Sequence, residues 1–263
     1  MRLNTIIKTD VMDGLKLLPD KTIDVIITSP PYNKAGLNGI RVGSSKNNWK
    51  STIDYGGDIS IDCKPEDEYQ QWQIDFLNEC KRILRDDGSL FYNHKNRIHN
   101  GFIVSPYEWI LKSRMRVRQE ITWNRGSGNN LNPCRYIPSN EIIFWLTKNK
   151  SVSFKRPVGM KNKSETWKID FNRNTKHPAP FPLEIPDTIL DCIPNNNENK
   201  IVLDPFMGSG TVAISAIKHG FHWLGFELLD EYVDMANNRI KNFYDENNSN
   251  GIDYENCFPI DIP

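Results

Sequence analysis

Residues 23–32 read IDVIITSPPY, in which a nearly continuous apolar run is followed at once by a serine, two prolines and a tyrosine. Such a run is typical of a strand that is buried on both faces of a parallel sheet. Residues 200–211, KIVLDPFMGSGT, repeat the pattern, because a second expected strand at 200–203 runs into a turn that contains glycines. We therefore expect two buried strands, each with an unusual turn at its carboxyl end.

Strands and helices are expected to alternate around these two stretches. Apolar periodicity and turn residues predict further strands at 4–9, 89–93, 120–123, 141–147 and 223–227, and helices at 11–18, 66–84, 183–193, 211–219 and 231–243. This alternation predicts an α/β fold, a doubly wound and mostly parallel sheet with helices on both faces. In such sheets ligands bind at the carboxyl ends of strands, near the point where strand order reverses. The two turns are thus expected to be neighbours at one edge of the sheet.

The composition excludes several classes of protein. The chain has 263 residues, a length that suits one large domain. Its hydrophobic fraction of 38%, charged fraction of 25% and mean hydropathy of −0.57 exclude an integral membrane protein and a fully disordered chain. The N-terminus lacks the apolar core of a signal peptide, and the five cysteines form no C-x-x-C pair. We expect a cytoplasmic protein that holds no metal.

A net charge of zero conceals an uneven distribution of charge. Residues 112–176 contain fifteen lysines and arginines but four acidic residues, and a segment with this excess is attracted to polyanions. Three of its arginines alternate as they would on one face of a strand, and others lie among asparagines that suit the edges of guanine and adenine. The side chains concerned are Arg114, Arg116, Arg118, Arg125, Asn129, Asn130, Asn132 and Arg135.

The second turn has the features of an adenosine-cofactor site. Gly208 and Gly210 allow the backbone to approach a ligand closely, and the helix expected near Thr211 directs free N–H groups at it. No lysine follows the glycines, which argues against the phosphate loop of a nucleotide hydrolase. Glu227 ends the next expected strand, 17 residues after Gly210, where a carboxylate can bind ribose hydroxyls. Asp10 ends the first expected strand and is placed to contact an adenine amine.

The first turn is rigid and offers hydrogen-bond acceptors. Each proline fixes its own φ angle, restricts the residue before it and donates no N–H. The Ser29 hydroxyl and the Pro30 carbonyl are therefore the expected acceptors, and Tyr32 adds a flat aromatic face. Acceptors beside an aromatic ring suit a planar ligand that carries an NH2 group.

The two turns together resemble the motifs of DNA amino-methyltransferases, which transfer a methyl group from S-adenosylmethionine to cytosine N4 or adenine N6. IDVIITSPPYN is similar to their catalytic motif, VLDPFMGSGTVAISAIKHGFHWLGFEL to their cofactor motif, and residues 177–190 to the cofactor-binding segment that precedes it. The catalytic motif comes first, as in the permuted, beta-type subgroup. The resemblance implies one circularly permuted methyltransferase domain at 1–263, with a mobile loop at 33–62 and a DNA-recognition segment in the basic region 112–176.

The resemblance also implies roles for individual residues. Ser29, Pro30, Pro31 and Tyr32 would be catalytic and would hold a base flipped out of double-stranded DNA. The residues implied to bind the cofactor are Asp10, Asp204, Phe206, Gly208, Gly210, Thr211 and Glu227. Those implied to contact DNA are Arg114, Arg116, Arg118, Arg125 and Arg135. The family further suggests a restriction-modification system, with a cognate restriction endonuclease and a homodimer as partners.

The target base stays open between two amines. Within the family, serine at the first motif position occurs more often with cytosine N4, and aspartate or asparagine with adenine N6. Ser29 therefore favours cytosine N4, and adenine N6 is the alternative. An RNA methyltransferase and a non-catalytic DNA-binding partner are less favoured. Pro133-Cys134 resembles the nucleophile segment of cytosine-C5 methyltransferases, but no buried strand is expected before it, and we assign Cys134 no catalytic role.

Overall fold

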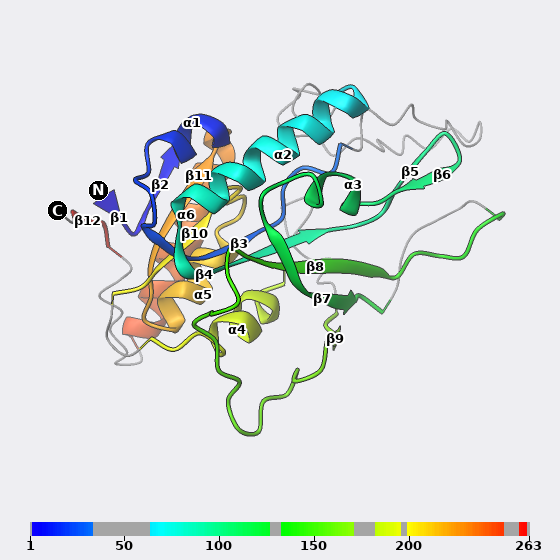
Figure 1. Ribbon diagram of the computed structural model, residues 1–263. Coiled ribbons are helices and arrows are strands. Elements are labelled where there is room, and N and C mark those ends of the chain that lie inside the picture. The colour runs from blue at the N-terminus through cyan, green and yellow to red at the C-terminus, as the bar shows by residue number, and fades with distance from the viewer. Residues whose placement is uncertain are drawn as a thin grey trace, which may run out of the picture.

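An eight-stranded sheet forms the centre of the protein (Figure 1). The computed structural model describes residues 2–33, 64–126, 133–170, 182–195, 199–249 and 258–261. Across the sheet the order is β2 (Thr5–Lys8), β11 (His222–Glu227), β10 (Ile201–Asp204), β3 (Ile23–Thr28), β4 (Leu84–His94), β8 (Asn140–Thr147), β7 (Arg116–Asn124) and β9 (Thr166–Lys168). Strands β2 to β4 in this order are parallel, β8 is antiparallel to both its neighbours, and β9 is parallel to β7. The predicted α/β fold with a mostly parallel sheet is confirmed.

Helices cover both faces of the sheet because successive residues of a strand point to opposite faces. Val25 and Ile27 of β3 lie in one apolar core, and Ile26 lies in the other. The first core contains residues of α4, α5 and α6, and the second contains residues of α1, α2 and α3 (Figure 1). The helix bounds are α1 (Val11–Lys16), α2 (Glu66–Ile83), α3 (Tyr107–Ile110), α4 (Glu184–Leu190), α5 (Thr211–Lys218) and α6 (Asp230–Asn248). The sheet is therefore doubly wound, as predicted.

Four short strands were not predicted from the sequence. Strands β5 (Arg97–His99) and β6 (Phe102–Val104) form a hairpin whose turn has positive φ at Asn100 and Gly101. Strands β1 (Arg2–Leu3) and β12 (Ile260–Asp261) pair near the termini. With two or three residues each, these strands carry too little alternation to be recognised in a sequence.

The start of β4 differs from the prediction. The sequence predicts a helix at 66–84 and a strand at 89–93 with a gap of polar residues between them, yet β4 begins directly after α2 at Leu84. Its pairing with β3 shifts register between Ile23 and Val25, so the polar residues lie in an irregular part of the strand. Among the described residues, no helix has the length and apolar character that crossing a membrane requires.

Candidate active site

The two predicted turns follow neighbouring strands. β3 and β10 pair in parallel, with Val25 opposite Val202 and Ile26 opposite Leu203. At their ends the Thr28 hydroxyl donates a hydrogen bond of 2.8 Å to Asp204. From these strands the sheet continues through β4 on one side and β11 on the other, the arrangement that places a ligand site at the strand ends. The prediction that the two turns meet at one edge is confirmed.

The turn after β10 depends on two glycines. φ is +51° at Gly208 and +77° at Gly210, a region of backbone conformation that favours glycine. Gly210 also lies close to α6, because a Cβ atom there would come within 3.1 Å of the Ala236 Cβ. The Met207 N–H donates to the Phe226 carbonyl at 2.9 Å and so attaches the turn to β11. A larger side chain at residue 210 would disturb this shape.

Glu227 ends β11 and binds the glycine turn. One carboxylate oxygen accepts the Gly208 N–H at 2.8 Å, and the other accepts the N–H groups of Leu228 and Leu229 at 2.9 and 3.1 Å. Burial raises the pKa of Glu227, although these three N–H groups oppose the shift. Because a carboxylate offers about four lone-pair sites, Glu227 can still accept a hydrogen bond from a ligand hydroxyl.

Two further predicted carboxylates lie on the same edge. Burial raises the pKa of Asp204 to about 7, even though the carboxylate accepts hydrogen bonds from Thr28 and from the Phe206 N–H. Asp10 is exposed and caps α1 by accepting the Met12 N–H at 2.8 Å. It follows β2, which pairs with β11. The predicted acidic residues thus stand at the ends of three adjacent strands.

The remaining predicted cofactor residues border the glycine turn. Phe206 is half-buried, with its ring centroid 5.3 Å from that of Phe76 in α2. Thr211 begins α5, and its hydroxyl accepts a hydrogen bond of 2.8 Å from Arg239 of α6. The same Arg239 nitrogen donates to the Ser209 carbonyl and hydroxyl, both at 3.0 Å. Sequence analysis missed Arg239, because nothing in the sequence indicates which residue of α6 faces the turn.

The turn after β3 leads into a buried network of polar side chains. The Ser29 and Tyr32 hydroxyls are 2.9 Å apart, and Tyr32 donates to Glu141 Oε2 at 3.0 Å. The Asn93 amide donates to Tyr32 at 2.7 Å and to Glu141 Oε2 at 2.9 Å. The other Glu141 oxygen lies 3.1 Å from Arg125 Nη1. The network therefore connects the ends of β3, β4 and β7 with the start of β8.

The Ser-Pro-Pro-Tyr turn is also fixed to the helix beside it. The Tyr69 hydroxyl of α2 donates to the Pro31 carbonyl at 2.8 Å and lies 2.8 Å from His94 Nε2. The Tyr32 ring packs on His94, with centroids 4.4 Å apart, and only 7% of Tyr32 is exposed. The expected open aromatic face of Tyr32 is therefore not observed. The Tyr32 hydroxyl is hydrogen-bonded in the buried network, and this position buries the ring as well.

The sequence could have indicated part of this network. Asn93 closes the strand predicted at 89–93, and ligands bind at strand ends. That rule could therefore have selected Asn93 as a candidate site residue. Glu141 begins the strand predicted at 141–147, and its place depends on the antiparallel pairing of β8 with β4. That pairing is a tertiary feature which the sequence does not reveal.

Three of the five predicted DNA-binding arginines lie away from the site. β7 runs in the same direction as β4. Arg116 of β7 pairs with Thr147 of β8, and Thr147 pairs in turn with Ser89 of β4. Arg116 therefore lies toward the amino-terminal end of β4, whereas the site lies at its carboxyl end. Arg114 and Arg118 lie beside Arg116 at this end of β7. A bulge between residues 117 and 119 interrupts the alternation expected for these arginines. Their DNA-binding role stays a prediction without support from proximity to the site.

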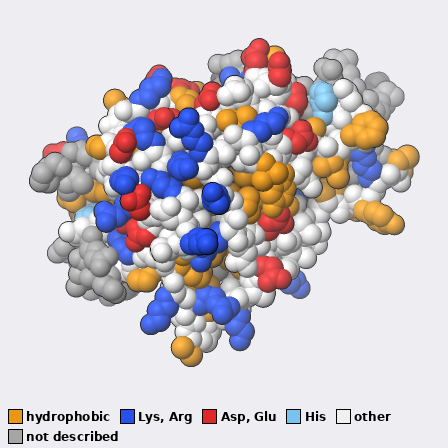
Figure 2. Space-filling view, viewed as in Figure 1, with side chains coloured by type: hydrophobic (Ala, Val, Ile, Leu, Met, Phe, Trp, Pro, Cys, Tyr) orange, Lys and Arg blue, Asp and Glu red, His pale blue; other side chains and the backbone are white. Residues whose placement is uncertain are grey.

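The other two arginines lie on the side of the site. Arg125 follows β7, and its guanidinium pairs with Glu141 in the buried network. Its contact with DNA stays a prediction. Arg135 is half-buried and donates to the Gly101 carbonyl of the β5–β6 hairpin at 2.6 Å. Exposed basic residues are also found between β8 and β9, toward the bottom of the view in Figure 2: Lys155, Arg156, Lys161 and Lys163.

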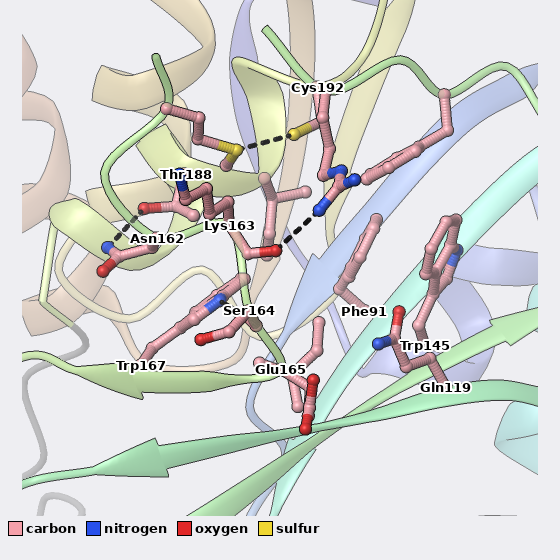
Figure 3. Close-up of a pocket in the computed structure, with 15 residues that line it drawn as sticks. Phe91, Gln119, Trp145, Asn162, Lys163, Ser164, Glu165, Trp167, Thr188 and Cys192 are labelled. Atoms are coloured by element: carbon pink, nitrogen blue, oxygen red, sulfur yellow. Dashed lines mark hydrogen bonds between the residues drawn. The ribbon is translucent and has the colours of Figure 1, made fainter. Parts of the chain in front are cut away.

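A cavity of about 280 Å³ lies elsewhere, between the sheet, α4 and residues 154–167 (Figure 3). Its walls include four aromatic side chains, Phe91, Trp145, Phe154 and Trp167. None of the predicted catalytic, cofactor-binding or DNA-binding residues lines it. The cavity is therefore distinct from the edge at which the two turns meet.

Some predictions lie outside the described residues. They concern the loop expected to be mobile at 33–62, of which only Asn33 is described, the asparagines at 129, 130 and 132, and residues 177–181 of the segment at 177–190. Residues 184–190 of that segment form α4. Cys134 is exposed, and its lack of a catalytic role stays a prediction.

Two strand-end turns at one edge of a doubly wound sheet form the framework of a methyltransferase, and comparison with known proteins identifies the family. The family model N6_N4_Mtase, described as DNA methylase, matches residues 23–238. The chain belongs to this DNA methylase family. The type II methyltransferase M.BglII of Bacillus subtilis is 28% identical to it, over 94% of this chain and 71% of its own length.

Solved structures have the same fold. The PvuII DNA methyltransferase (cytosine-N4-specific) has a TM-score of 0.68 at 19% identity and covers 92% of this chain and 91% of its own. The complex of M1.HpyAVI with S-adenosylmethionine has a TM-score of 0.60 at 20% identity and covers 90% of this chain and 98% of its own. The predicted resemblance to the amino-methyltransferase family is confirmed.

Proposed function

We propose that this DNA methylase transfers a methyl group from S-adenosylmethionine to the N4 amine of cytosine in duplex DNA. One observation carries the proposal: the Ser-Pro-Pro-Tyr turn and the glycine turn follow paired strands and are joined by the hydrogen bond between Thr28 and Asp204. A methyl donor in the second turn and an amine in the first would therefore lie side by side.

The described residues fit the cofactor. The glycine turn and the start of α5 offer backbone at close range, and Glu227 can accept from a ribose hydroxyl. Asp10 presents an exposed carboxylate at the next strand end, and Phe206 borders the turn. S-adenosylmethionine, when bound, supplies an electrophilic methyl group on a sulfonium, which is an excellent leaving group.

Ser29 and Pro30 act on the amine. An exocyclic amine is a poor nucleophile because its lone pair is delocalised into the ring. Hydrogen bonds from its two hydrogens to Ser29 Oγ and the Pro30 carbonyl draw the nitrogen toward tetrahedral geometry and direct its lone pair at the methyl carbon. Transfer is then direct, without a covalent adduct to the protein, and correct positioning provides much of the rate.

The target base must leave the duplex to reach this edge. Extrusion costs a few kcal/mol and is the usual solution for enzymes that modify a base. Contacts between phosphates and basic residues on the side of the site, such as Arg135, would offset this cost. Because Tyr32 is buried against His94, we propose that the ring supports the turn that holds the base.

Ser29 favours cytosine N4 over adenine N6. A neutral hydroxyl at the first motif position is the feature that separates this chain from the aspartate and asparagine variants associated with adenine. The family model spans both specificities, so adenine N6 is the second candidate. We further propose that the protein acts in a restriction-modification system beside a cognate endonuclease, as the type II relative suggests, and that a homodimer is its functional form.

Identification of the methylated nucleoside tests the proposal. The protein is incubated with duplex DNA and S-adenosylmethionine labelled on the methyl group, and the DNA is digested to nucleosides. We expect N4-methylcytosine; N6-methyladenine would support the second candidate, and no label in DNA would refute DNA methylation. Cys134→Ser provides a matched control, because loss of an exposed thiol without a role leaves the yield unchanged.

A further inference from the structure

Glu141 determines which hydroxyl donates and which accepts in the hydrogen bonds of the Ser-Pro-Pro-Tyr turn. An ionised carboxylate only accepts, so Tyr32 donates its single hydrogen to Glu141 Oε2 at 3.0 Å. The Ser29 hydroxyl, 2.9 Å from that of Tyr32, must then donate to the Tyr32 oxygen. Ser29 Oγ also accepts from the Asn93 amide at 3.4 Å, and its second lone pair can accept from a ligand. The result is a directed chain from Ser29 through Tyr32 to Glu141.

The residues around Glu141 keep it as the acceptor at the end of this hydrogen-bond chain. Arg125 lies 3.1 Å from one of its oxygens, and the Asn93 amide donates to the other at 2.9 Å. The opposite orientation of the Asn93 amide would set its oxygen against the carboxylate, so its nitrogen faces Glu141. In this orientation the buried Asn93 Oδ1 has no hydrogen-bond partner among the residues that the structure describes. Tyr32, Asn93 and Arg125 therefore all present hydrogen-bond donors to the Glu141 carboxylate at the inner end of the chain.

We propose that Glu141 is a positioning residue that orients the Ser29 and Tyr32 hydroxyls and receives the proton lost by the amine. The inference rests on the proposed function, because it requires an exocyclic amine at Ser29. It extends that function by naming the group that takes up the proton.

The proposed step balances atoms and charge. As the amine nitrogen bonds to the methyl carbon, the electron pair of the broken C–S bond stays on sulfur. The nitrogen, now positively charged, gives a proton to Ser29 Oγ, Ser29 gives its own to the Tyr32 oxygen, and Tyr32 gives its own to Glu141. Both hydroxyls and the methylated amine end neutral, and Glu141 ends as a carboxylic acid.

Tyr32 passes the proton without becoming an anion. Burial, and then the nearby charge of Glu141, raise the pKa of Tyr32 well above its usual range. An ionised tyrosine is therefore unfavourable, and the two hydroxyls must exchange protons together. Such a transfer requires the short contacts that are observed between them.

Single-turnover methylation by variants tests the inference. Glu141→Gln retains the side-chain shape but lacks the proton acceptor, and Tyr32→Phe interrupts the chain while the Glu141–Arg125 pair stays intact. We expect each to lower the rate by about 100-fold or more, the range typical of general acid–base groups. Affinities for S-adenosylmethionine and for DNA should stay within about twofold, and the double variant should be no slower than the slower single one.

A matched control lies on β7, the strand that pairs with β8, where Glu141 lies. Glu120 of β7 also accepts from a tyrosine hydroxyl, that of Tyr107, but is exposed and outside the network. Glu120→Gln should therefore methylate at the wild-type rate. In Glu141→Ala, formate should restore part of the rate by replacing the missing carboxylate, whereas formamide, which has the same shape without the charge, should not.

The outcomes separate this inference from the proposed function. If the wild-type protein transfers no methyl group to DNA, both fail. If the wild type is active and Glu141→Gln or Tyr32→Phe keeps its rate, the inference alone is overturned. It is also overturned if formate and formamide restore Glu141→Ala equally, because Glu141 would then act only as a support. Should Glu141→Gln fail to fold, Tyr32→Phe decides the matter.

Discussion

The two halves of the active-site edge are built in different ways. The cofactor half, at the ends of β10 and β11, is made by backbone: N–H groups of Gly208 and Phe206 donate to Glu227 and Asp204. The base half, at the ends of β3, β4 and β8, is made by side chains, and its bond between Tyr32 and Glu141 spans 109 positions. A backbone site depends on residues that permit a conformation, whereas a side-chain network depends on individual functional groups.

This difference implies that cofactor binding and methyl transfer can be lost separately. A substitution in the glycine turn should abolish affinity for S-adenosylmethionine, and a substitution in the network should slow transfer while the cofactor still binds. The hydrogen bond between Thr28 and Asp204 joins the two halves, so Asp204 is the residue at which they should influence one another.

The largest effect is expected for Gly210→Val. A valine at φ +77° is strained by about 1–3 kcal/mol, and its Cβ would press on Ala236, which adds a similar amount. Together these should weaken binding of S-adenosylmethionine by about 1,000-fold, or ~4 kcal/mol. Isothermal titration calorimetry measures the affinity.

Gly159→Val is the control for that experiment. Gly159 has a similar φ of +81°, but a Cβ atom there would meet no described residue within 4 Å, and Gly159 lies far along the chain from the turn. Its variant should bind the cofactor as the wild type does. Wild-type affinity in Gly210→Val would contradict the placement of the cofactor half.

The next effect concerns Asp204 and pH. Its pKa is about 7 in the folded protein because of burial, above the usual value of 3.8 that applies to the unfolded chain. Between these values the folded protein holds a proton that the unfolded chain has released, so stability is present at low pH and is lost as the pH rises toward 7. From pH 5 to pH 8 we expect the free energy of unfolding to fall by about 2–3 kcal/mol from this group alone.

Urea unfolding of the wild type and of Asp204→Asn at several pH values measures this contribution. Asparagine imitates the protonated acid, so the variant should lack that part of the pH dependence and should be the more stable protein at pH 8. Parallel pH profiles for the two proteins would show that Asp204 titrates normally.

A smaller effect is expected for Ser29→Ala. The variant loses one of the two acceptors that hold the amine, and a hydrogen bond to a group that gains charge contributes about 1.5–3 kcal/mol. Because the variant also interrupts the chain from Ser29 to Glu141, the rate of methyl transfer should fall by about 100-fold, as for Tyr32→Phe, whereas the affinity for S-adenosylmethionine stays unchanged. A parallel loss of cofactor affinity would break the distinction between the two halves.

The smallest effects are expected for the arginines. Arg135→Ala should weaken DNA binding several-fold and reduce the salt dependence by about one ion, because Arg135 lies on the side of the site. Arg116→Ala should change neither, because Arg116 lies toward the opposite edge. Equal losses in fluorescence-anisotropy titrations would place DNA across both edges of the sheet.

The same contrast explains how much the sequence could predict. β3, β10, α5 and β11 occupy their predicted positions to within one residue, because a continuous apolar run and a glycine turn are local signals. The cofactor half follows from those elements alone. The base half does not, because Glu141 reaches Tyr32 only through the pairing of β8 with β4. For the same reason the ion pair between Arg125 and Glu141 could not be predicted.

Photolabelling with S-adenosylmethionine that carries tritium on its methyl group tests the central claim most directly. After irradiation, digestion and peptide mapping, we expect the label on peptides that contain residues 29–32 or 204–211, and we expect S-adenosylhomocysteine to prevent it. Label on residues 154–167, which border the separate cavity of Figure 3, would contradict the account.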